Sequence, residues 1–526
     1  MAASIVLVGL GAQYAVPGVY IELDFAQGPV AGSGSLRKIL LLGNKTSSGT
    51  ATNDTVVYGP DTATPCQTEA DVIGLFGTGS QLHRMFLRFA AINTVSSLYF
   101  LAVTSSAGTA ASTTCTIATA ATSGGNHRFW FNDQFVDTSI NTGDTAIVIA
   151  GNIVTSINAQ TRWPVTAANS GTAVVTVTQK IPGPEGNWCR AQALITPTTA
   201  TIGTTTTLTA NTFLTSGATA DVNTTALGTI NPARYYYIVS GDSDATNVGR
   251  VITQVNTQAL PLNGIRQRVV FGSSDTLANT ITVATGVNAA RAECIWGSSV
   301  DVPPSELAAN MAAIFSLLEL GSAFGVARKN FSNFPANDTD QASWQILPGR
   351  LGYANSPTPT QVNSALQNGI SPIAIRQQSG AAYFVKRCTT RSLNGAVNDF
   401  RVRDAHKVSV CDYWCDDAGA VTALQFSGKD LLPDPVQGQP PPGPQAVTPK
   451  RWGGALKSLV NNYGSANQWT YPPGITALPG EAPSDTINRL MVIQPETNPP
   501  NRLSALVPLS PVNLADQFAL LAQQVG

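Results

Sequence analysis

Three apolar runs in the middle of the chain constrain its fold more than any other feature. They are residues 235–240, 267–272 and 292–297, and each ends in a cluster of glycine, serine or aspartate. The segments between them are long enough for crossover helices, and apolar strands joined by helices are typical of buried parallel sheets. Residues 303–318 follow the third run with two prolines and then apolar residues at helical spacing. The sequence therefore predicts an open α/β sheet.

The turn clusters lie where such a sheet usually holds a ligand, at the carboxyl ends of its strands. The chain has only three histidines, His83, His127 and His406, and none is in or next to these turns. Neither a Gly-x-Ser-x-Gly elbow nor a Gly-x-x-x-x-Gly-Lys-Ser/Thr phosphate loop occurs. We interpret the aspartates and serines of the turns as helix caps, because their short side chains accept the free amides of a first helical turn. The sequence predicts no catalytic residue and no enzymatic activity.

Two other patterns resemble ligand sites but lack a required part. Gly9-Leu10-Gly11 follows an apolar run, but the third glycine of a dinucleotide loop is missing and Pro17 would stop the helix that should follow. His406, Cys411 and Cys415 could be metal ligands, but His406 and Cys411 are five residues apart and do not share a helix face. A fourth ligand for a tetrahedral site is also not evident. We therefore expect no cofactor and no metal.

The low charge of the chain indicates a protein that is covered by its neighbours. With 526 residues the chain is too long to fold around one hydrophobic core. Only 12% of its residues are charged, and its net charge is -1. There is no basic excess for direct nucleic acid binding. Seven scattered cysteines favour a reducing compartment, no apolar run is long enough for a membrane span, and no Lys or Arg precedes Arg37. We expect synthesis and assembly in the cytoplasm of the cell, with no membrane partner.

Changes in amino-acid composition and in hydrophobic pattern divide the chain into five segments. Between the apolar strands lies a region rich in Thr, Ala, Gly and Asn, with short alternating runs at residues 128–131, 146–149 and 173–178 and one helix near residues 153–160. A proline tract at residues 433–449 reads as a solvated spacer. The predicted boundaries are 1–35 for an N-terminal extended arm, 36–104 for a first part of the α/β core, 105–228 for an inserted β-rich outer domain, 229–387 for the rest of the core, and 388–526 for an α+β C-terminal domain that ends in a second arm.

Both ends of the chain contain a strand pattern beside flexible residues. Residues 19–25 alternate between polar and apolar, whereas residues 516–525 fit either a strand or a short helix. A lone strand has to pair with a sheet edge, either its own or that of a neighbour. The arm residues predicted to join subunits are Val19, Tyr20, Ile21, Leu23, Phe25, Phe518, Leu520, Ala522 and Gln524.

Several short segments, taken in order, carry a resemblance to a known family. They include Val16-Pro17-Gly18-Val19-Tyr20, residues 76–82, residues 183–187 and the strand at 234–240. In this order the chain resembles contractile bacteriophage tail sheath proteins, most closely their Mu-like branch, over nearly its full length. The resemblance implies a subtilisin-like core without protease activity and a strand at residues 516–525.

The resemblance also implies a function and a set of partners. A sheath subunit polymerises as stacked rings around a tail tube and contracts to drive the tube through the host envelope for genome delivery. Its partners would be further copies of itself, the tail tube protein, and the baseplate and tail terminator proteins, and its place would be the virion tail. Two alternatives stay open, a serine hydrolase on the same core and the sheath of a related contractile injection system. A surface adhesin would need an export signal, which we do not find.

One local basic excess interrupts the weakly charged sequence. It comprises Lys386, Arg387, Arg391, Arg401, Arg403 and Lys407. Such residues usually form a solvated face, but in a sheath they could meet acidic groups on the inner tube or on a neighbouring subunit.

Overall fold

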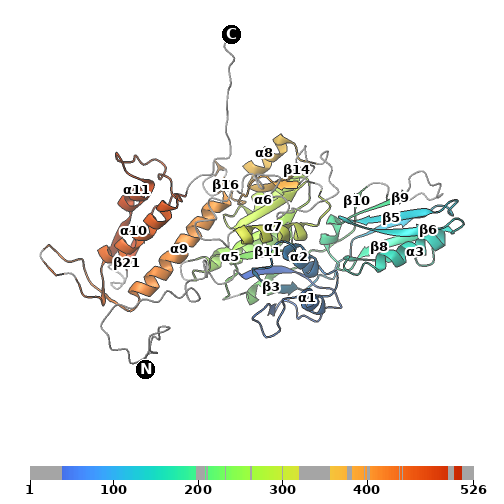
Figure 1. Ribbon diagram of the computed structural model, residues 1–526, viewed down its shortest axis with the longest axis horizontal. Helices are drawn as coiled ribbons and strands as arrows, with labels where there is room; N and C mark the ends of the chain where they lie inside the picture. The colour runs from blue at the N-terminus through green and yellow to red at the C-terminus, as the bar shows by residue number, and fades with distance from the viewer. Residues whose placement is uncertain are drawn as a thin grey trace, which may run out of the picture.

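The computed structural model describes most of the chain between residues 38 and 511. The described residues are 38–196, 208, 211–230, 233–260, 263–298, 300–318, 356–375, 382–395, 397–399, 403–437, 439–440, 442–495 and 503–511. Within them the fold is a row of three parts (Figure 1), with the β-rich segment at one end, the large sheet in the middle and the C-terminal helices at the other end.

The central part is an eight-stranded sheet with the order β15-β14-β13-β12-β11-β1-β3-β2. The six inner strands are parallel, and the two edge strands, β2 and β15, are antiparallel to their neighbours. The three predicted apolar runs become adjacent parallel strands, which confirms the mixed α/β class. The strands are β1 (Lys38–Asn44), β2 (Val57–Tyr58), β3 (Ser97–Val103), β11 (Tyr237–Ser240), β12 (Arg268–Ser273), β13 (Ala292–Gly297), β14 (Ile370–Ile375) and β15 (Ala382–Phe384).

Helices cover both faces of this sheet. Alternate residues of β1 point to opposite faces, so Ile39 and Leu41 pack with one set of helices and Leu40 and Leu42 with the other. This two-sided burial explains why the strands are apolar without interruption. The first set is α1 (Glu69–Phe76), α2 (Gln81–Ala90) and α7 (Pro304–Leu318), and the second is α4 (Thr224–Thr229), α5 (Ala245–Gln258), α6 (Leu277–Val287) and α8 (Pro359–Gln367).

The β-rich segment has two sheets and a hydrophobic core of its own. One sheet has the order β10-β9-β5-β6 and the other β4-β8-β7, with α3 (Ala146–Asn158) packed on them. The strands are β4 (Ser112–Thr116), β5 (Gly125–Phe131), β6 (Gln134–Ile140), β7 (Val165–Ala168), β8 (Val174–Gln179), β9 (Arg190–Thr196) and β10 (Thr212–Phe213), and the short helix η1 (Pro184–Trp188) lies between β8 and β9.

One expectation for this segment is wrong. Residues 146–149 were expected to form a strand, but they are the first turn of α3. The Thr145 side chain accepts a hydrogen bond from the amide of Val148, and Ile149, Ile153 and Ile157 recur at helical spacing on the buried side. A four-residue apolar run cannot distinguish the two structures, because its periodicity becomes clear only over the following turns.

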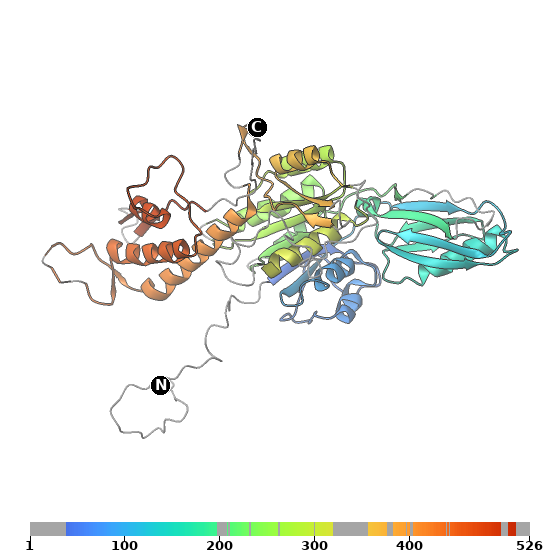
Figure 2. The ribbon, with the colours of Figure 1, turned by 45° about the horizontal axis from the view of Figure 1, so that its top comes forward.

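The C-terminal part packs three helices around a small core. Helix α9 (Ala405–Phe426) runs from the central sheet to α10 (Pro449–Ser465), as Figures 1 and 2 show, and α11 (Pro483–Leu490) packs beside α10. Residues 403–414 have a helix-like pattern in the sequence, and the helix in the structure continues beyond them to Phe426. Three two-stranded sheets complete this part: β16 (Leu393–Asn394) with β17 (Val397–Asn398), β18 (Asp430–Leu431) with β19 (Ala446–Val447), and β20 (Val492–Pro495) with β21 (Leu503–Leu506).

A search of the described helices for a stretch long and apolar enough to cross a membrane finds none.

The close packing of β12 against α7 gives a first test of the fold. A Cβ on Gly272 would overlap the carbonyl oxygen of Pro304, which belongs to the backbone and cannot move away cheaply. We expect Gly272→Ala to lower the free energy of unfolding by about 2–3 kcal/mol. Gly286→Ala is the control, because its new methyl would meet only Ala245, at 3.8 Å, and should raise stability by about 0.5–1 kcal/mol within helix α6. Urea denaturation of both variants measures the difference, and equal effects would contradict the packing.

Candidate functional site

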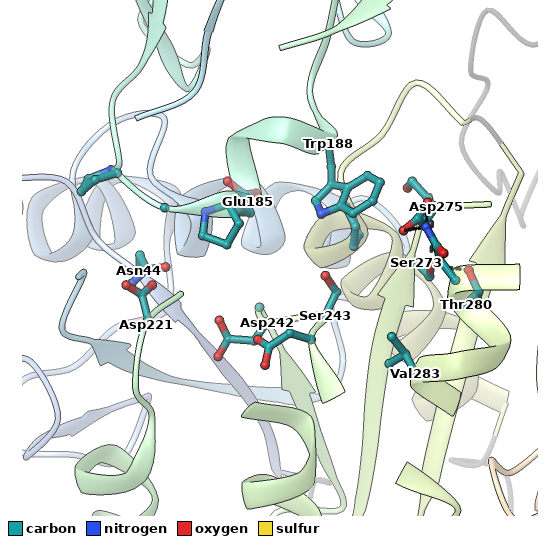
Figure 3. Close-up of a pocket in the computed structure, with 18 residues that line it drawn as sticks. Asn44, Glu185, Trp188, Asp221, Asp242, Ser243, Ser273, Asp275, Thr280 and Val283 are labelled. Atoms are coloured by element: carbon teal, nitrogen blue, oxygen red, sulfur yellow. Dashed lines mark hydrogen bonds between the residues drawn. The ribbon is translucent and has the colours of Figure 1, made fainter. Parts of the chain in front are cut away.

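The carboxyl ends of the central strands border a cavity of about 250 Å³. Its floor comes from the turns after β11 and β12, and its roof comes from Glu185 and Trp188 of η1 in the β-rich segment (Figure 3). The cavity therefore lies at the junction between the central sheet and the β-rich segment. This is the position at which an α/β sheet usually binds ligands.

Some of the turn residues are helix caps, as the sequence predicts. Asp244 is the N-cap of α5, where its carboxylate accepts hydrogen bonds from the amides of Thr246 at 3.1 Å and Asn247 at 2.9 Å. Asp275 accepts a hydrogen bond from the amide of Thr276 at 2.6 Å, and Thr276 itself caps α6. These contacts hold both helix starts against the strand ends.

Asp242 lines the cavity without capping a helix. Its nearest polar contact is the side-chain amide of Asn223, which donates to its carboxylate over 3.4 Å. Burial raises the pKa of Asp242 to about 8, with the neighbouring carboxylates of Asp244 and Asp221 adding to the shift. Burial also raises the pKa of Asp221. The cavity thus holds a carboxyl group that keeps its proton at neutral pH.

The lining supplies carboxyl, hydroxyl and amide groups but no histidine, cysteine or lysine among the residues that the structure describes. Over the same residues, no hydrogen bond joins the hydroxyl of Ser243 to a group that could accept its proton. Nor are any three His, Cys, Asp or Glu side chains in the described ranges placed to hold a metal ion. The described residues therefore form a cavity with several polar groups on a largely apolar lining, and they show no assembled nucleophile–base pair.

The three histidines lie far apart in the fold. His83 in α2 is buried, with Nδ1 accepting from the amide of Gly79 at 3.0 Å and Nε2 lying 3.2 Å from Glu69, and burial lowers its pKa. His127 in β5 is buried within the β-rich segment, and burial lowers its pKa to about 4. His406 is buried near the start of α9. Each packs in a different part of the protein, and none lines the cavity.

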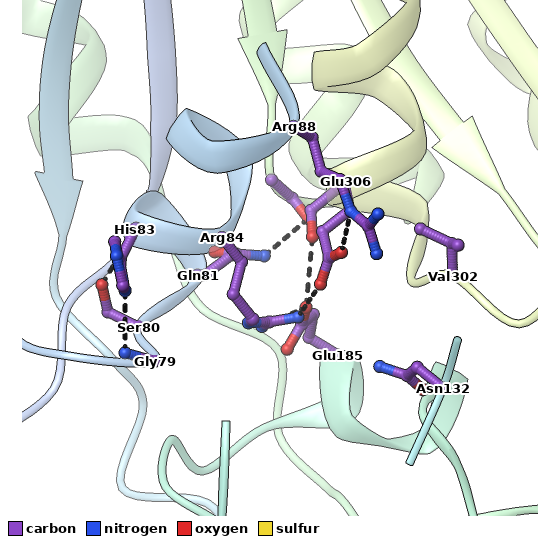
Figure 4. A network of polar contacts seen from close by, with 12 residues as sticks. Gly79, Ser80, Gln81, His83, Arg84, Arg88, Asn132, Glu185, Val302 and Glu306 are labelled. Atoms are coloured by element: carbon purple, nitrogen blue, oxygen red, sulfur yellow. Dashed lines mark hydrogen bonds and ion pairs between the residues drawn. The ribbon is translucent and has the colours of Figure 1, made fainter. Parts of the chain in front are cut away.

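A network of buried ion pairs joins the central sheet to the β-rich segment beside the cavity (Figure 4). Arg84 of α2 donates from Nη1 to Glu306 of α7 at 2.6 Å and from Nη2 to Glu185 of η1 at 2.8 Å. Arg88 donates from Nε to Glu306 at 2.8 Å and from Nη2 to both oxygens of Asp133 at 2.8 Å. The side chains of Arg84 and Glu306 are each only 5% exposed. Two arginines of α2 thus share the buried Glu306 carboxylate of α7, and each also pairs with a carboxylate of the β-rich segment.

The electrostatics of this network favour the charged form of Glu306. Burial opposes its charge, but Arg88 and Arg84 outweigh burial, so the pKa of Glu306 is lowered. For Asp133 the balance is the reverse, because burial raises its pKa and Arg88 offsets only part of the change. The separate hydrophobic clusters of the sheet and the β-rich segment share no member. Ion pairs are therefore a main part of the joint between them.

No local pattern in the sequence predicts this network. Arg84 is 101 residues from Glu185 and 222 residues from Glu306 in the sequence, so no local pattern joins these partners. The only signal available was indirect: Arg84 and Arg88 are one turn apart on a helix of a weakly charged chain.

Two of the predicted tube- or neighbour-facing charges are corrected by the structure. Arg387 is 1% exposed, and its guanidinium donates to Glu293 and to the Tyr237 hydroxyl, each at 2.6 Å. Lys386 is 7% exposed and pairs with Asp404 at 2.8 Å. Both side chains are used inside the subunit, since they follow β15 directly into the core and need partners there.

The other charges of this group remain predictions. Arg391 and Arg403 are partly exposed, with Asp399 and Asp404 as their respective neighbours at 3.7 and 4.0 Å. Lys407 is also partly exposed. Arg401 and both predicted arm strands, residues 19–25 and 516–525, lie outside the described residues.

Comparison with known proteins gives one relative in sequence. The chain is 31% identical over 173 residues to the Mu-like prophage FluMu tail sheath protein of Haemophilus influenzae. This match covers 33% of the chain and 34% of the relative, so it spans about a third of the relative's length. No protein-family model matches the chain.

The solved structures that the comparison finds are more distant in sequence, and their TM-scores are below 0.5. A sheath tail protein of Desulfitobacterium hafniense has a TM-score of 0.43, covering 91% of this chain and 93% of that one, and a sheath tail protein of Listeria innocua has a TM-score of 0.46, covering 93% and 94%. A chain of the anti-feeding prophage baseplate has a TM-score of 0.45, covering 97% and 99%. All three are 11% identical to this chain. The sequence match to the FluMu protein, over its 173 residues, confirms the predicted resemblance of this chain to the Mu-like tail sheath proteins.

Proposed function

We propose that this chain is the sheath subunit of a contractile phage tail or of a related contractile injection system. Copies would polymerise as stacked rings around a tail tube in the host cytoplasm, and contraction would drive the tube through the host envelope. The observation that carries the proposal is the 173-residue match to a tail sheath protein. In this role the central sheet would be a subtilisin-like scaffold without catalysis, and the β-rich segment would face outward.

The C-terminal part offers a surface through which copies could be linked. Strands β20 and β21 form a sheet of only two strands, so each has an edge without a partner strand among the described residues. Val492 is 50% exposed and Leu506 is 67% exposed. A two-stranded sheet is marginally stable alone, and added strands would satisfy its free backbone groups. We propose that arm strands 19–25 and 516–525 of neighbouring copies pair here.

Backbone pairing suits a lattice that has to change shape. Strands added to a sheet edge link two subunits by hydrogen bonds close to the joint, which survive while the larger bodies rotate against each other. The subunits would then move mainly as rigid bodies between two packed arrangements. The tube, baseplate and tail terminator proteins would be the other partners, with Arg391, Arg401, Arg403 and Lys407 as candidates for contacts with the tube or a neighbour.

Electron microscopy tests the proposal directly. The purified full-length protein is expected to form hollow tubes of stacked rings in negative stain. A protein that stays monomeric at all concentrations and salts, together with stoichiometric labelling of a serine by a fluorophosphonate probe, would overturn the proposal in favour of a hydrolase.

Truncation tests the role of the arms. Removing residues 512–526 should leave a folded, soluble protein that no longer forms tubes, and removing residues 1–26 should do the same. Sedimentation measures assembly, and circular dichroism measures folding. Normal long tubes from both truncated proteins would contradict the linking role, whereas loss of the circular dichroism signal would show that the arms complete the subunit's own fold.

A further inference from the structure

Helix α9 crosses the central sheet at the amino ends of its strands. Arg234, Arg266 and Arg291 precede β11, β12 and β13 by one to three residues, so the parallel arrangement brings them to the same edge of the sheet. Asp412 and Asp416, one turn apart on α9, lie opposite them. The sheet edge therefore presents a row of arginines to a helix with two carboxylates.

The ion pairs follow the order of the strands. Asp412 receives both terminal nitrogens of Arg291 at 2.7 Å, which is a bidentate contact. Asp416 receives Arg266 at 2.9 Å on one oxygen and Arg234 at 2.6 Å on the other. We call these three pairs the α9 latch. Neighbouring strands lie about 4.8 Å apart and four residues of a helix rise about 6 Å, so a helix laid across the sheet can meet one strand start per turn.

The start of α9 is anchored differently from the latch. Ala405 and Ser409 are fully buried, the Ser409 hydroxyl accepts a hydrogen bond from Arg268 of β12 at 2.6 Å, and the backbone of Asp404 pairs with Cys388. Val410 and Trp414 of α9 already belong to the C-terminal core, and beyond Asp416 the helix runs on away from the sheet beside α10, as Figure 2 shows. Within the described residues, Tyr413 alone packs against the hydrophobic clusters of both the sheet and the C-terminal part. The helix therefore has a buried pivot, then the latch, then the attached C-terminal part.

The latch is more exposed than the other polar joint of the protein. Its five side chains are 14–29% exposed, whereas the five side chains of the joint to the β-rich segment are 5–20% exposed, with Arg84 and Glu306 at 5%. Partly solvated ion pairs contribute little net stability because water can replace each partner, while a deeply buried charge cannot lose its partner cheaply. The two joints of the subunit thus differ in how easily they open.

We propose that the α9 latch is a releasable joint, at which the C-terminal part swings about residues 405–409 relative to the sheet while both parts stay folded. The β-rich segment stays fixed to the sheet by its buried network. In a sheath this would place the internal flexibility of each subunit between the body and the part that carries the linking strands. That consequence rests on the proposed function, but the joint itself does not.

The double variant Asp412→Asn and Asp416→Asn tests the joint in the full-length, unassembled protein. We expect an increased radius of gyration in small-angle X-ray scattering and a roughly tenfold faster proteolytic cleavage in residues 388–404. Circular dichroism should be unchanged, because both hydrophobic cores keep all their buried members and only the half-buried Tyr413 gives up a contact at their border. In the unaltered protein, about 1 M salt should also increase the radius of gyration and the cleavage rate, because it shortens the electrostatic screening length to about 3 Å and weakens the ion pairs.

Glu481→Gln is the matched control, because it breaks an Arg–carboxylate pair with Arg489 inside the C-terminal part, where the two side chains are 9% and 37% exposed, and leaves the latch intact. This variant should scatter and cleave like the unaltered protein. Unchanged scattering and cleavage for the double variant and at high salt would refute the proposed joint. An equal increase of the radius of gyration and the cleavage rate in Glu481→Gln would refute it as well. If the double variant does not fold, the salt experiment on the unaltered protein decides alone. Failure of tube formation would refute the proposed function without affecting these readouts.

Discussion

Replacing Glu306 by glutamine is expected to lower the free energy of unfolding by about 3–5 kcal/mol. The amide keeps the shape of the side chain but removes the negative charge that faces Arg84 and Arg88. Arg84 is almost fully buried, and an uncompensated charge in that position cannot be hydrated. Urea denaturation of the full-length variant measures the loss.

Asp137→Asn provides the control for this experiment. It breaks the pair between Asp137 and Arg128, which is also an Arg–carboxylate contact, at 2.7 Å, but its side chains are 35% and 31% exposed. We expect a change below about 1 kcal/mol. Similar losses for both variants would contradict the role of burial in the network.

Limited proteolysis adds a structural readout to the Glu306→Gln experiment. Because Glu306 connects α2, α7 and, through Arg84, η1, its loss should expose the connections between the sheet and the β-rich segment first. Cleavage near residues 104–111 and 217–223 should then appear before cleavage in either core. Cleavage that begins inside the sheet would show that the network stabilises the core and does not join two parts.

Asp242→Asn is expected to stabilise the protein at pH 8 and above, by about 2–4 kcal/mol. In the folded protein the pKa of Asp242 is raised to about 8, chiefly by burial, while an unfolded aspartate titrates near about 4. Between these values the folded state binds a proton that the unfolded state has released. Stability therefore falls as the pH rises from about 4 to about 8, and the full penalty is present above that range.

The asparagine variant should lack this part of the pH dependence. Its stability should match that of the unaltered protein below about pH 4, and the two curves should separate as the pH rises. Asp137→Asn has the opposite sign, because pairing with Arg128 lowers the pKa of Asp137 and the ionised form is stabilising above about pH 4. Thermal unfolding at a series of pH values compares the three proteins. Parallel curves for Asp242→Asn and the unaltered protein would show that the carboxyl of Asp242 is not held protonated.

The sequence predicted the central sheet because its signals are local and repeated. Strands β11, β12 and β13 are buried on both faces, so their side chains are continuously apolar, and the connecting segments have helix caps such as Asp244 at the expected positions. The start of helix α3 was wrongly predicted as a strand because its local signal is ambiguous. Its first four residues are all apolar, and only later turns distinguish a helix from a strand.

The candidate site was only partly predictable. The turns at the strand ends were identified as the place for a ligand, and the cavity does lie there. The sequence could not show that Glu185 and Trp188, from a different part of the chain, form its roof. Nor could it show that Asp242 is half-buried near two other carboxylates, because that depends on which turns meet in space.

The sequence by itself determined the α/β class, the adjacent parallel strands and the resemblance to tail sheath proteins, because apolar periodicity, caps and the order of short segments are written along the chain. Only the tertiary structure decided which charges are partners. Arg387 reads as a surface residue in a basic stretch, yet the fold buries it against Glu293. Asp412 and Asp416 read as the polar face of a helix, yet they meet arginines from three separate strand starts. An ion pair depends on distance in space, and side chains 94 to 222 residues apart become neighbours only when the sheet has formed.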